Sequence, residues 1–313
     1  MNNILSLVKP LNLLEEKTKF FSSDSYNPQF SYTLLFTKDE LQHWGLPQER
    51  LYTHALYMLT HFPLTTPVED LITREEIEQE IEKFNQHYTL DAPIIAHFSE
   101  KYLSRCKVSP PNIYFQLPLT YSHGRFSGLY RHELETHVLR TANETLQPWH
   151  ETPTAEVLLR RTEEGLANLH THLFRKNKIL HKSYFSYVAT YLAQQASFRT
   201  VFDHLVQYGC TPATAWNVAV KVKRGLTDTS QPGGLTKEIC YFEGTIHIWQ
   251  WLMDKANDPH QLYLGRIAAE QIPELAPIAQ TEGLRFPTFF ADMDLYYTHT
   301  AEIGAVNNFK ELL

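Results

Sequence analysis

Two histidines and two glutamates are grouped in the segment RHELETHVLR, residues 131–140. Imidazole nitrogens bind zinc, and a carboxylate beside such a ligand can take a proton from water at an open coordination position. Helices that bind catalytic zinc usually place their two histidines four residues apart, whereas His132 and His137 are five apart. The segment is therefore either a metal site with one extra residue or a helix that carries two ordinary histidines.

The spacing has a geometric consequence, because each residue of an α-helix advances about 100° around the axis. Residues four apart lie about 40° apart, but residues five apart lie about 140° apart. That angle would point His137 away from a metal held by His132. A π-helical turn absorbs the extra residue and returns both imidazoles to one side. A metal site at this segment thus predicts a local π-bulge.

Further blocks follow in a fixed order: Gln147-Pro148, then RTEEGLA at residues 161–167, then VKRG and GGLTKEICYFEG. Together with the HExxxH segment they span about residues 110–250. In these blocks the chain resembles the metallopeptidases marked by a QEGLA motif, a family of tyrosine/phenylalanine carboxypeptidase domains that includes the microtubule-associated tyrosine carboxypeptidases. In that family the five-residue histidine spacing is part of the pattern.

Carried over to this sequence, the resemblance implies a zincin-like metallopeptidase with bound Zn²⁺. The implied metal ligands are His132, His137 and Glu164. Glu133 is the implied catalytic base, and Glu135 is a competing carboxylate two residues further on. Where the family motif has glutamine this chain has Glu163, which is also the alternative ligand. Gly165 beside Glu164 would allow close packing of the ligand-bearing helix.

Other histidines near these blocks are candidates of a different kind. His170 and His172 share a predicted helix with Glu164 and form a rival ligand set. His170 lies six residues on, about 240° around the helix, so we expect these histidines to be solvated or hydrogen-bonded to other residues of the chain instead. His123, in the turn before the HExxxH helix, is not expected to bind metal.

Three downstream residues could bind a substrate. Arg224 is the first candidate to hold a terminal carboxylate, because a guanidinium pairs bidentately with a carboxylate. Lys237 could also contact the carboxylate, and Tyr241, four residues later, could donate to the developing oxyanion. Thr236 is the candidate helix cap. The alternative is a capped helix with an exposed lysine and a core tyrosine.

The elements that must position these residues are mostly helices. Interrupted helix is expected over 37–61, with breaks near Gly45 and Pro47, and a capping box, Thr73 to Glu76, opens a helix to about His87. Further helices are predicted over 126–142, 155–174, 179–195, 197–208, 212–225, 235–254 and 259–270. NIYFQL, residues 112–117, is the best strand candidate and QFSYTLLF, 29–36, a weaker one. NIYFQL is either a strand that pairs with an extended substrate or a plain core strand.

Composition excludes several classes of protein. The net charge of −7 argues against nucleic-acid binding, and the basic runs 175–178 and 221–224 are expected to be solvated helix faces. Three separated cysteines suit a reducing compartment. No signal peptide and no membrane-spanning segment is recognisable, so a cytoplasmic protein is expected.

The sequence therefore predicts an α+β, predominantly α-helical fold with a small strand element beside the active-site helix. A helical region, 1–105, would precede a catalytic region, 106–313, although one domain is also compatible. The expected activity is that of a zinc carboxypeptidase removing a C-terminal, aromatic residue from a peptide or protein tail, with a tubulin-like tail as one option. The alternatives are a binding or regulatory protein with a structural metal site, or a zinc endo- or aminopeptidase. The sequence does not fix the oligomeric state.

Overall fold

The computed structural model of the protein describes residues 4–64, 70–100, 102, 105–150 and 156–313. The chain divides into two compact units, of which the first comprises residues 1–65 and 179–243 with Leu312. The second comprises residues 66–178 and 244–311 with Leu313. The boundary expected near residue 105 falls inside the second unit. Independent folding of the regions on either side of it stays a prediction.

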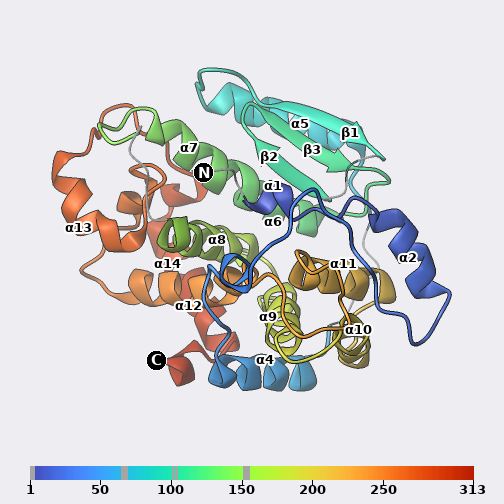
Figure 1. The fold of residues 1–313 in the computed structure, drawn as a ribbon. Helices are drawn as coiled ribbons and strands as arrows, with labels where there is room; N and C mark the ends of the chain where they lie inside the picture. Colours follow the sequence, from blue (N-terminus) through green and yellow to red (C-terminus); the bar gives the residue numbers. More distant parts are fainter. Residues whose placement is uncertain (1–3, 65–69, 101, 103–104, 151–155) are drawn as a thin grey trace. The chain divides into compact units, whose positions relative to one another are not determined.

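The regular elements described in the first unit are helices (Figure 1). They are α1 (Ile4–Leu7), α2 (Leu13–Phe21), α3 (Lys38–Leu41), α4 (Glu49–His61), α9 (His181–Ala193), α10 (Phe198–Gln207), α11 (Pro212–Lys223) and the first residues of α12 (Ile239–Met253). Leu51, Ala55 and Met58 form a buried stripe at helical spacing on α4, which packs against α9. The predicted break near Gly45 and Pro47 is confirmed between α3 and α4.

The second unit contains a three-stranded sheet in the order β1 (Ile95–Ser99), β3 (Asn112–Gln116), β2 (Cys106–Ser109). β3 pairs in parallel with β1 and antiparallel with β2. Helix α5 (Arg74–His87) packs beside β1, and the predicted capping box at its start is confirmed. The predicted strand NIYFQL is confirmed as β3.

The position of β3 corrects one prediction. It is the central strand, so both of its edges already bond to neighbouring strands and neither can accept a substrate backbone. β2 lies at an edge of the sheet and packs against the widened helical turn that carries the HExxxH segment.

The helical part of the second unit holds the HExxxH and EEGLA segments. Its elements are α6 (His123–His132), the π-helix η1 (Glu133–Val138), α7 (Leu139–Glu144), α8 (Glu156–His172), the remainder of α12, η2 (Pro259–Tyr263), η3 (Ala269–Gln271), α13 (Ile272–Leu275), η4 (Ala276–Ile278), η5 (Thr288–Ala291), α14 (Met293–Val306) and η6 (Phe309–Leu312). α8 packs against α6, η1 and α14. The mostly helical α+β character predicted from the sequence is confirmed.

Three element predictions were wrong. The helix expected over 259–270 is two separate 3₁₀ turns, because Gly265 adopts φ +127° between them and interrupts the helix. Residues 29–36 form no strand, and only Gln29 makes an isolated bridge, to Asp228. Helix α12 begins at Ile239 and not at 235, since the N–H and hydroxyl of Thr236 both donate to the carbonyl of Leu41 (2.9 and 3.3 Å). Thr236 is therefore not the predicted cap.

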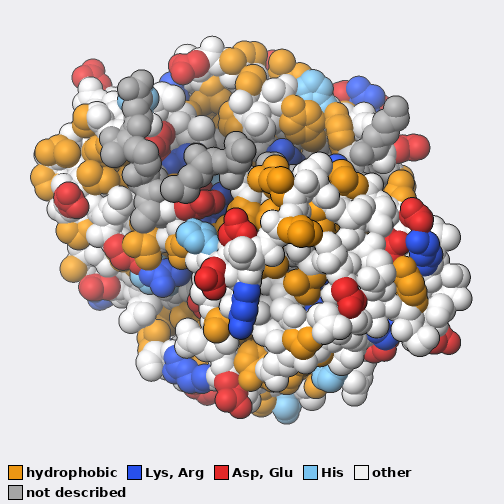
Figure 2. Space-filling model, viewed as in Figure 1, with side chains coloured by type: hydrophobic (Ala, Val, Ile, Leu, Met, Phe, Trp, Pro, Cys, Tyr) orange, Lys and Arg blue, Asp and Glu red, His pale blue; other side chains and the backbone are white. Residues whose placement is uncertain are grey.

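The surface mixes charge signs. On the face drawn in Figure 2, the Lys and Arg side chains are interspersed with Asp and Glu side chains and apolar residues. Within the described ranges, none of the helices has the length and apolar character to cross a bilayer.

Candidate metal centre

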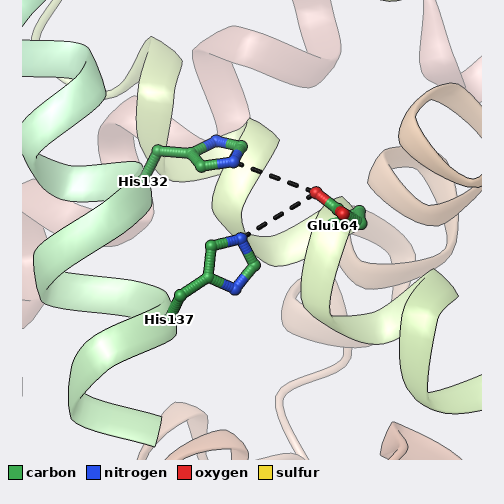
Figure 3. Close-up of side chains that lie close together, drawn as sticks. All are labelled: His132, His137 and Glu164. Atoms are coloured by element: carbon green, nitrogen blue, oxygen red, sulfur yellow. Dashed lines mark ion pairs between the residues drawn. The ribbon is translucent and has the colours of Figure 1, made fainter. Parts of the chain in front are cut away.

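The π-bulge predicted from the histidine spacing is confirmed. Residues Glu133–Val138 form a π-helix between α6 and α7, and the N–H of Leu139 donates to the carbonyl of Leu134, five residues back. The extra residue in this turn brings His132 and His137 to the same side of the helix (Figure 3). Their ring centroids lie 5.0 Å apart.

Both imidazoles face one carboxylate from the neighbouring helix α8. Nε2 of His132 lies 3.9 Å, and Nε2 of His137 3.8 Å, from Oε2 of Glu164 (Figure 3). Glu164 is buried, and the two histidines are largely buried. A ligand atom of each residue lies within 4.8 Å of those of the other two. The three residues predicted as ligands thus converge on one point.

Two glycines allow α8 to approach its neighbours closely. A Cβ on Gly165 would lie 2.3 Å from the backbone carbonyl of Gly244 in α12, so only glycine fits at this crossing. A Cβ on Gly128 in α6 would lie 2.6 Å from the carbonyl oxygen of Thr171 in α8. The close packing expected at Gly165 is confirmed. It helps to fix the position of α8 and so of Glu164 beside the histidines.

Thr171 orients the first histidine. Its hydroxyl donates to the carbonyl of Ala167 (2.9 Å), so its oxygen is left to accept the Nδ1–H of His132 (3.0 Å). With the proton on Nδ1, the lone pair of Nε2 points toward Glu164 and is available to a metal. Thr171 was not identified from the sequence, although it lies seven residues, two helical turns, after Glu164.

The chemistry of these donors fits zinc. Two imidazole nitrogens and one carboxylate oxygen form a His₂Glu set of the kind that leaves a fourth position open. Two atoms that each lie about 2.1 Å from one ion are at most about 4.2 Å apart. The observed separations of 3.9 and 3.8 Å meet this condition.

The two candidate bases have different surroundings. Glu133 directly follows His132, is half-buried and lies near Tyr121, whose pKa is raised mainly by burial and further by the charges of Cys106 and Glu133. The carboxylate of Glu135 is buried and accepts from the N–H and hydroxyl of Thr288 (2.9 and 2.5 Å). Since Glu135 is engaged elsewhere, Glu133 is the better candidate.

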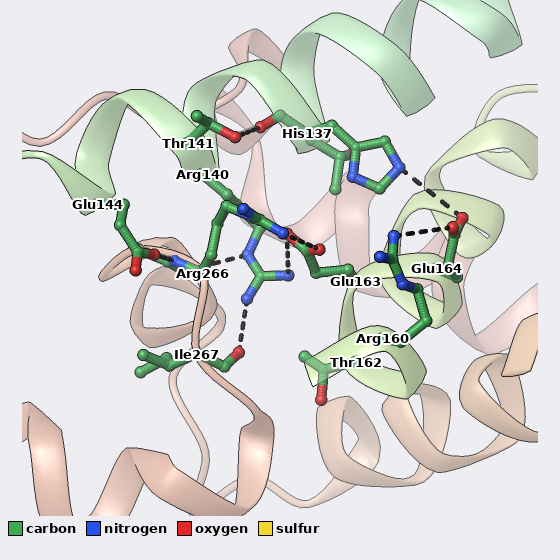
Figure 4. A network of polar contacts seen from close by, with 12 residues as sticks. His137, Arg140, Thr141, Glu144, Arg160, Thr162, Glu163, Glu164, Arg266 and Ile267 are labelled. Carbon is green, nitrogen blue, oxygen red and sulfur yellow. Dashed lines mark hydrogen bonds and ion pairs between the residues drawn. The ribbon is translucent and has the colours of Figure 1, made fainter. Parts of the chain in front are cut away.

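The two adjacent glutamates of α8 also point to different partners. Glu163 makes a bidentate ion pair with Arg266, with Nε–Oε1 and Nη2–Oε2 distances of 2.9 and 3.1 Å, and lies 3.9 Å from Nη1 of Arg140 (Figure 4). Burial acts to raise the pKa of Glu163, but the hydrogen bonds from Arg266 and the charge of Arg140 outweigh it and lower the pKa to about 2. Glu163 is therefore engaged by arginines and does not belong to the group of side chains that could hold a metal.

An arginine missed by sequence reasoning lies beside the centre. Nη1 of Arg160 is 3.7 Å from Oε1 of Glu164, the oxygen not facing the histidines (Figure 4). The two residues are four apart on α8, which is a recognisable spacing for an ion pair on one helix face. Arg160 therefore adds positive charge next to the three converging side chains.

The other histidines do not join the centre. His170 is fully buried and bonds to Thr136 and Tyr296, as expected for a partner-bonded histidine. His172 is buried at the end of α8, and His123 is half-exposed at the start of α6, 3.9 Å from Glu76. Among the described residues, the group able to hold a metal comprises only His132, His137 and Glu164.

Lys237 and Tyr241, in the first unit, form a contact pair. Nζ of Lys237 donates to the Tyr241 hydroxyl (2.9 Å) and lies 4.4 Å from the centre of its ring. Lys237 stands in a turn before α12 and is buried, so the alternative of an exposed lysine is wrong. The hydroxyl of Tyr241 thus lies beside a cation, which favours hydrogen-bond donation to an oxyanion.

Arg224 ends α11 in the same unit and shares a buried acidic neighbour with Lys221. The carboxylate of Glu238 lies 3.8 Å from Arg224 and 3.6 Å from Lys221. Nε of Arg224 is buried and has no hydrogen-bond partner among the described residues. Lys223 is fully buried and donates to the carbonyls of Ala196 and Gln231 (2.9 and 2.5 Å), so the run 221–224 is not a solvated face as predicted.

Comparison with known proteins gives a consistent result. The family model for the microtubule-associated tyrosine carboxypeptidase matches residues 45–309. The mouse protein named "Putative tyrosine carboxypeptidase MATCAP2" is 31% identical over 98% of this chain and 62% of its own length. Human "Microtubule-associated tyrosine carboxypeptidase 1" is 30% identical over 98% of this chain and 69% of its own length. The chain thus spans about two thirds of these relatives.

Proposed function

The chain belongs to the microtubule-associated tyrosine carboxypeptidase family, and from this premise we propose that it is a zinc-dependent carboxypeptidase. The proposed substrate is a peptide or protein tail with a free C-terminus that ends in an aromatic residue, tyrosine or phenylalanine. A tubulin-like tail is included because the human relative is named for microtubules and tyrosine. The fold would be zincin-like and the protein cytoplasmic.

The convergence of His132, His137 and Glu164 carries this proposal. The π-turn supports this proposal, since a regular α-helix would separate the two imidazoles. In the proposal these three residues hold the zinc ion. When bound there, zinc would polarise the scissile carbonyl and lower the pKa of the attacking water.

The protein's own residues supply the remaining steps. Glu133 would take a proton from the attacking water and pass it to the leaving amine. Tyr241, with its hydroxyl held by Lys237, would donate to the oxyanion as it forms. Arg224 would hold the terminal carboxylate through its guanidinium, whose Nε has no hydrogen-bond acceptor among the described residues. The exposed edge of β2 is the proposed strand for pairing with the substrate backbone.

The zinc-loaded protein should be incubated with a peptide library and the products identified by mass spectrometry. Loss of a single C-terminal tyrosine or phenylalanine is expected, with amidated peptides left intact. Internal or N-terminal cleavage would show that the protein is an endopeptidase or an aminopeptidase and not a carboxypeptidase. Bound zinc without any cleavage would favour a structural metal site.

The catalytic base can be tested on the same helix. Glu133→Gln should keep its zinc content and fold but lose hydrolysis by a factor of about 100 or more. Glu135→Gln is the matched control, because its amide oxygen can still accept from Thr288. It should retain most of the activity. Unchanged hydrolysis in Glu133→Gln, measured together with zinc content, would exclude Glu133 as the base.

A further inference from the structure

Thr136, inside the π-turn, makes an unusual hydrogen bond. Its hydroxyl donates to the carbonyl of Arg131, five residues earlier, at 2.8 Å. Six other helical threonine hydroxyls among the described residues donate to the carbonyl four residues earlier, namely those of Thr18, Thr60, Thr141, Thr171, Thr190 and Thr298. The five-residue reach matches the π register, so this side chain bonds the widened turn and not a regular α-turn.

The oxygen of Thr136 has a second partner, His170. The distance from Thr136 Oγ1 to His170 Nδ1 is 2.9 Å, and both residues are fully buried. A hydroxyl has one hydrogen, and that hydrogen is donated to Arg131, so Nδ1 of His170 must donate. Burial lowers the pKa of His170 well below its usual value, which leaves the ring neutral with an unprotonated Nε2.

Tyr296 completes the chain. Its hydroxyl lies 3.1 Å from Nε2 of His170 and is the donor that the neutral ring requires. Tyr296 is fully buried on α14, whereas His170 lies on α8 and Thr136 on η1. Arg131 on α6 makes a second connection to α8, because its Nε donates to the carbonyl of His170 (3.1 Å). Three helices are thus joined by hydrogen bonds that end at the widened turn.

We propose that Thr136, His170 and Tyr296 are positioning residues that hold the π-turn in place and so keep His132 and His137 on one side. This inference rests on the proposed zinc site and assigns residues that neither bind the ion nor touch the substrate. The register of the turn decides which way His137 points, since reversion to α-helix would rotate it by about 100° relative to His132. The hydrogen-bond chain stabilises the π register because each of its buried groups would otherwise lack a partner.

Thr136→Val tests the proposal, because valine has the shape of threonine without the hydroxyl. It removes the hydroxyl bond to the Arg131 carbonyl and the acceptor of the His170 Nδ1–H, and zinc affinity should fall by about tenfold or more, the range seen when groups that orient metal ligands are removed. Thr136→Ser keeps the hydroxyl and should restore affinity. Tyr296→Phe should weaken zinc binding in the same direction.

Thr190→Val is the matched control. Thr190 is also fully buried, but its hydroxyl donates to the carbonyl of Ser186, four residues back in α9 of the first unit. Zinc affinity should be measured by competition with a chromophoric chelator, together with the visible spectrum of the Co²⁺-substituted protein. Hydrogen exchange of residues 133–139 without metal should be faster in Thr136→Val and unchanged in Thr190→Val.

The outcomes separate this inference from the proposed function. Zinc binding that is lost in Glu164→Ala, weakened in Thr136→Val and Tyr296→Phe, and unchanged in Thr190→Val supports both. If the wild type binds zinc, and Thr136→Val has the same zinc affinity and the same hydrogen-exchange rates as the wild type, the positioning role alone is overturned. If Thr136→Val does not fold, Tyr296→Phe decides in the same way. If the wild type does not bind zinc but hydrogen exchange is faster in Thr136→Val, the proposed function is overturned, and the role of Thr136 in stabilising the π-turn is still supported.

Discussion

Replacing Glu163 by glutamine should destabilise the protein by an amount that depends on pH. This change gives the QEGLA residue of the family at a position where this chain has a charge. The pKa of Glu163 falls from an ordinary value of 4.5 to about 2. Each tenfold change in the proton equilibrium corresponds to about 1.4 kcal/mol, so the ionised form is favoured over the neutral form by about 3 kcal/mol. Replacing the carboxylate by a neutral amide of similar shape should remove most of this stabilisation of the folded state.

The sign of the pH dependence follows from the lowered pKa. The stabilisation by Glu163 is fully present above its unfolded pKa of 4.5 and is lost as the pH falls through about 2. The difference in free energy of unfolding between wild type and Glu163→Gln should therefore be about 3 kcal/mol at pH 7. At pH 3.5 the unfolded carboxyl is mostly protonated, and the difference should fall to about 2 kcal/mol.

Urea unfolding followed by circular dichroism at pH 7 and pH 3.5 measures both values. Glu78→Gln is the matched control, because Glu78 pairs with Arg74 at 2.9 Å while both side chains are exposed. Its loss should stay below about 0.5 kcal/mol. The reasoning is refuted if Glu163→Gln is as stable as Glu78→Gln at pH 7, or if its deficit does not shrink at pH 3.5.

Three further changes test separate parts of the structure. Gly165→Ala should destabilise the protein by about 2 kcal/mol or more, since its Cβ would lie 2.3 Å from the backbone of Gly244; a urea midpoint equal to that of wild type would contradict the packing argument. Arg224→Gln should strongly reduce the hydrolysis of peptides with free C-termini but change little the binding of amidated peptides to the zinc-loaded protein. An equal loss in both measurements would contradict its carboxylate role. Tyr241→Phe should lower kcat on the order of 100-fold with unchanged zinc content, whereas a change in KM alone would assign the hydroxyl to substrate binding.

Helix geometry predicted the shape of the histidine segment because it relates residue spacing to side-chain direction, whereas the family resemblance supplied Glu164 as the third ligand. Histidines five apart require a π-turn if they share a ligand, and η1 is that turn. Gly165 beside Glu164 predicted a close helix crossing, which occurs at Gly244. The resemblance to the QEGLA family is confirmed by the family match. The first two inferences needed only neighbouring residues, whereas the resemblance rested on blocks that span about residues 110–250.

Elements whose buried face is only partly hydrophobic were missed. Helix α14 buries Tyr296, Thr300, Ile303 and Gly304 at helical spacing, so a polar and a small residue interrupt its apolar stripe. Gly304 is buried because it packs against Trp249, where a Cβ would lie 2.1 Å from the indole. Strands β1 and β2 are only half-buried and at most five residues long, so alternation along them is weak.

Residue spacing alone did not distinguish the two adjacent glutamates of α8; the family resemblance assigned Glu164 as the ligand and left Glu163 as the alternative. One residue along a helix is a rotation of about 100°, so only one of Glu163 and Glu164 can face the histidines. The choice is made by Arg266, which lies 103 residues from Glu163 in the chain and pairs with it on the other side of α8. Because Arg266 and Arg140 offset the charge of Glu163, we expect only a small effect of that charge on the ligand beside it. Zinc affinity should therefore change little in Glu163→Gln even though stability falls, and a large loss of affinity would show that the Glu163 charge does reach the metal.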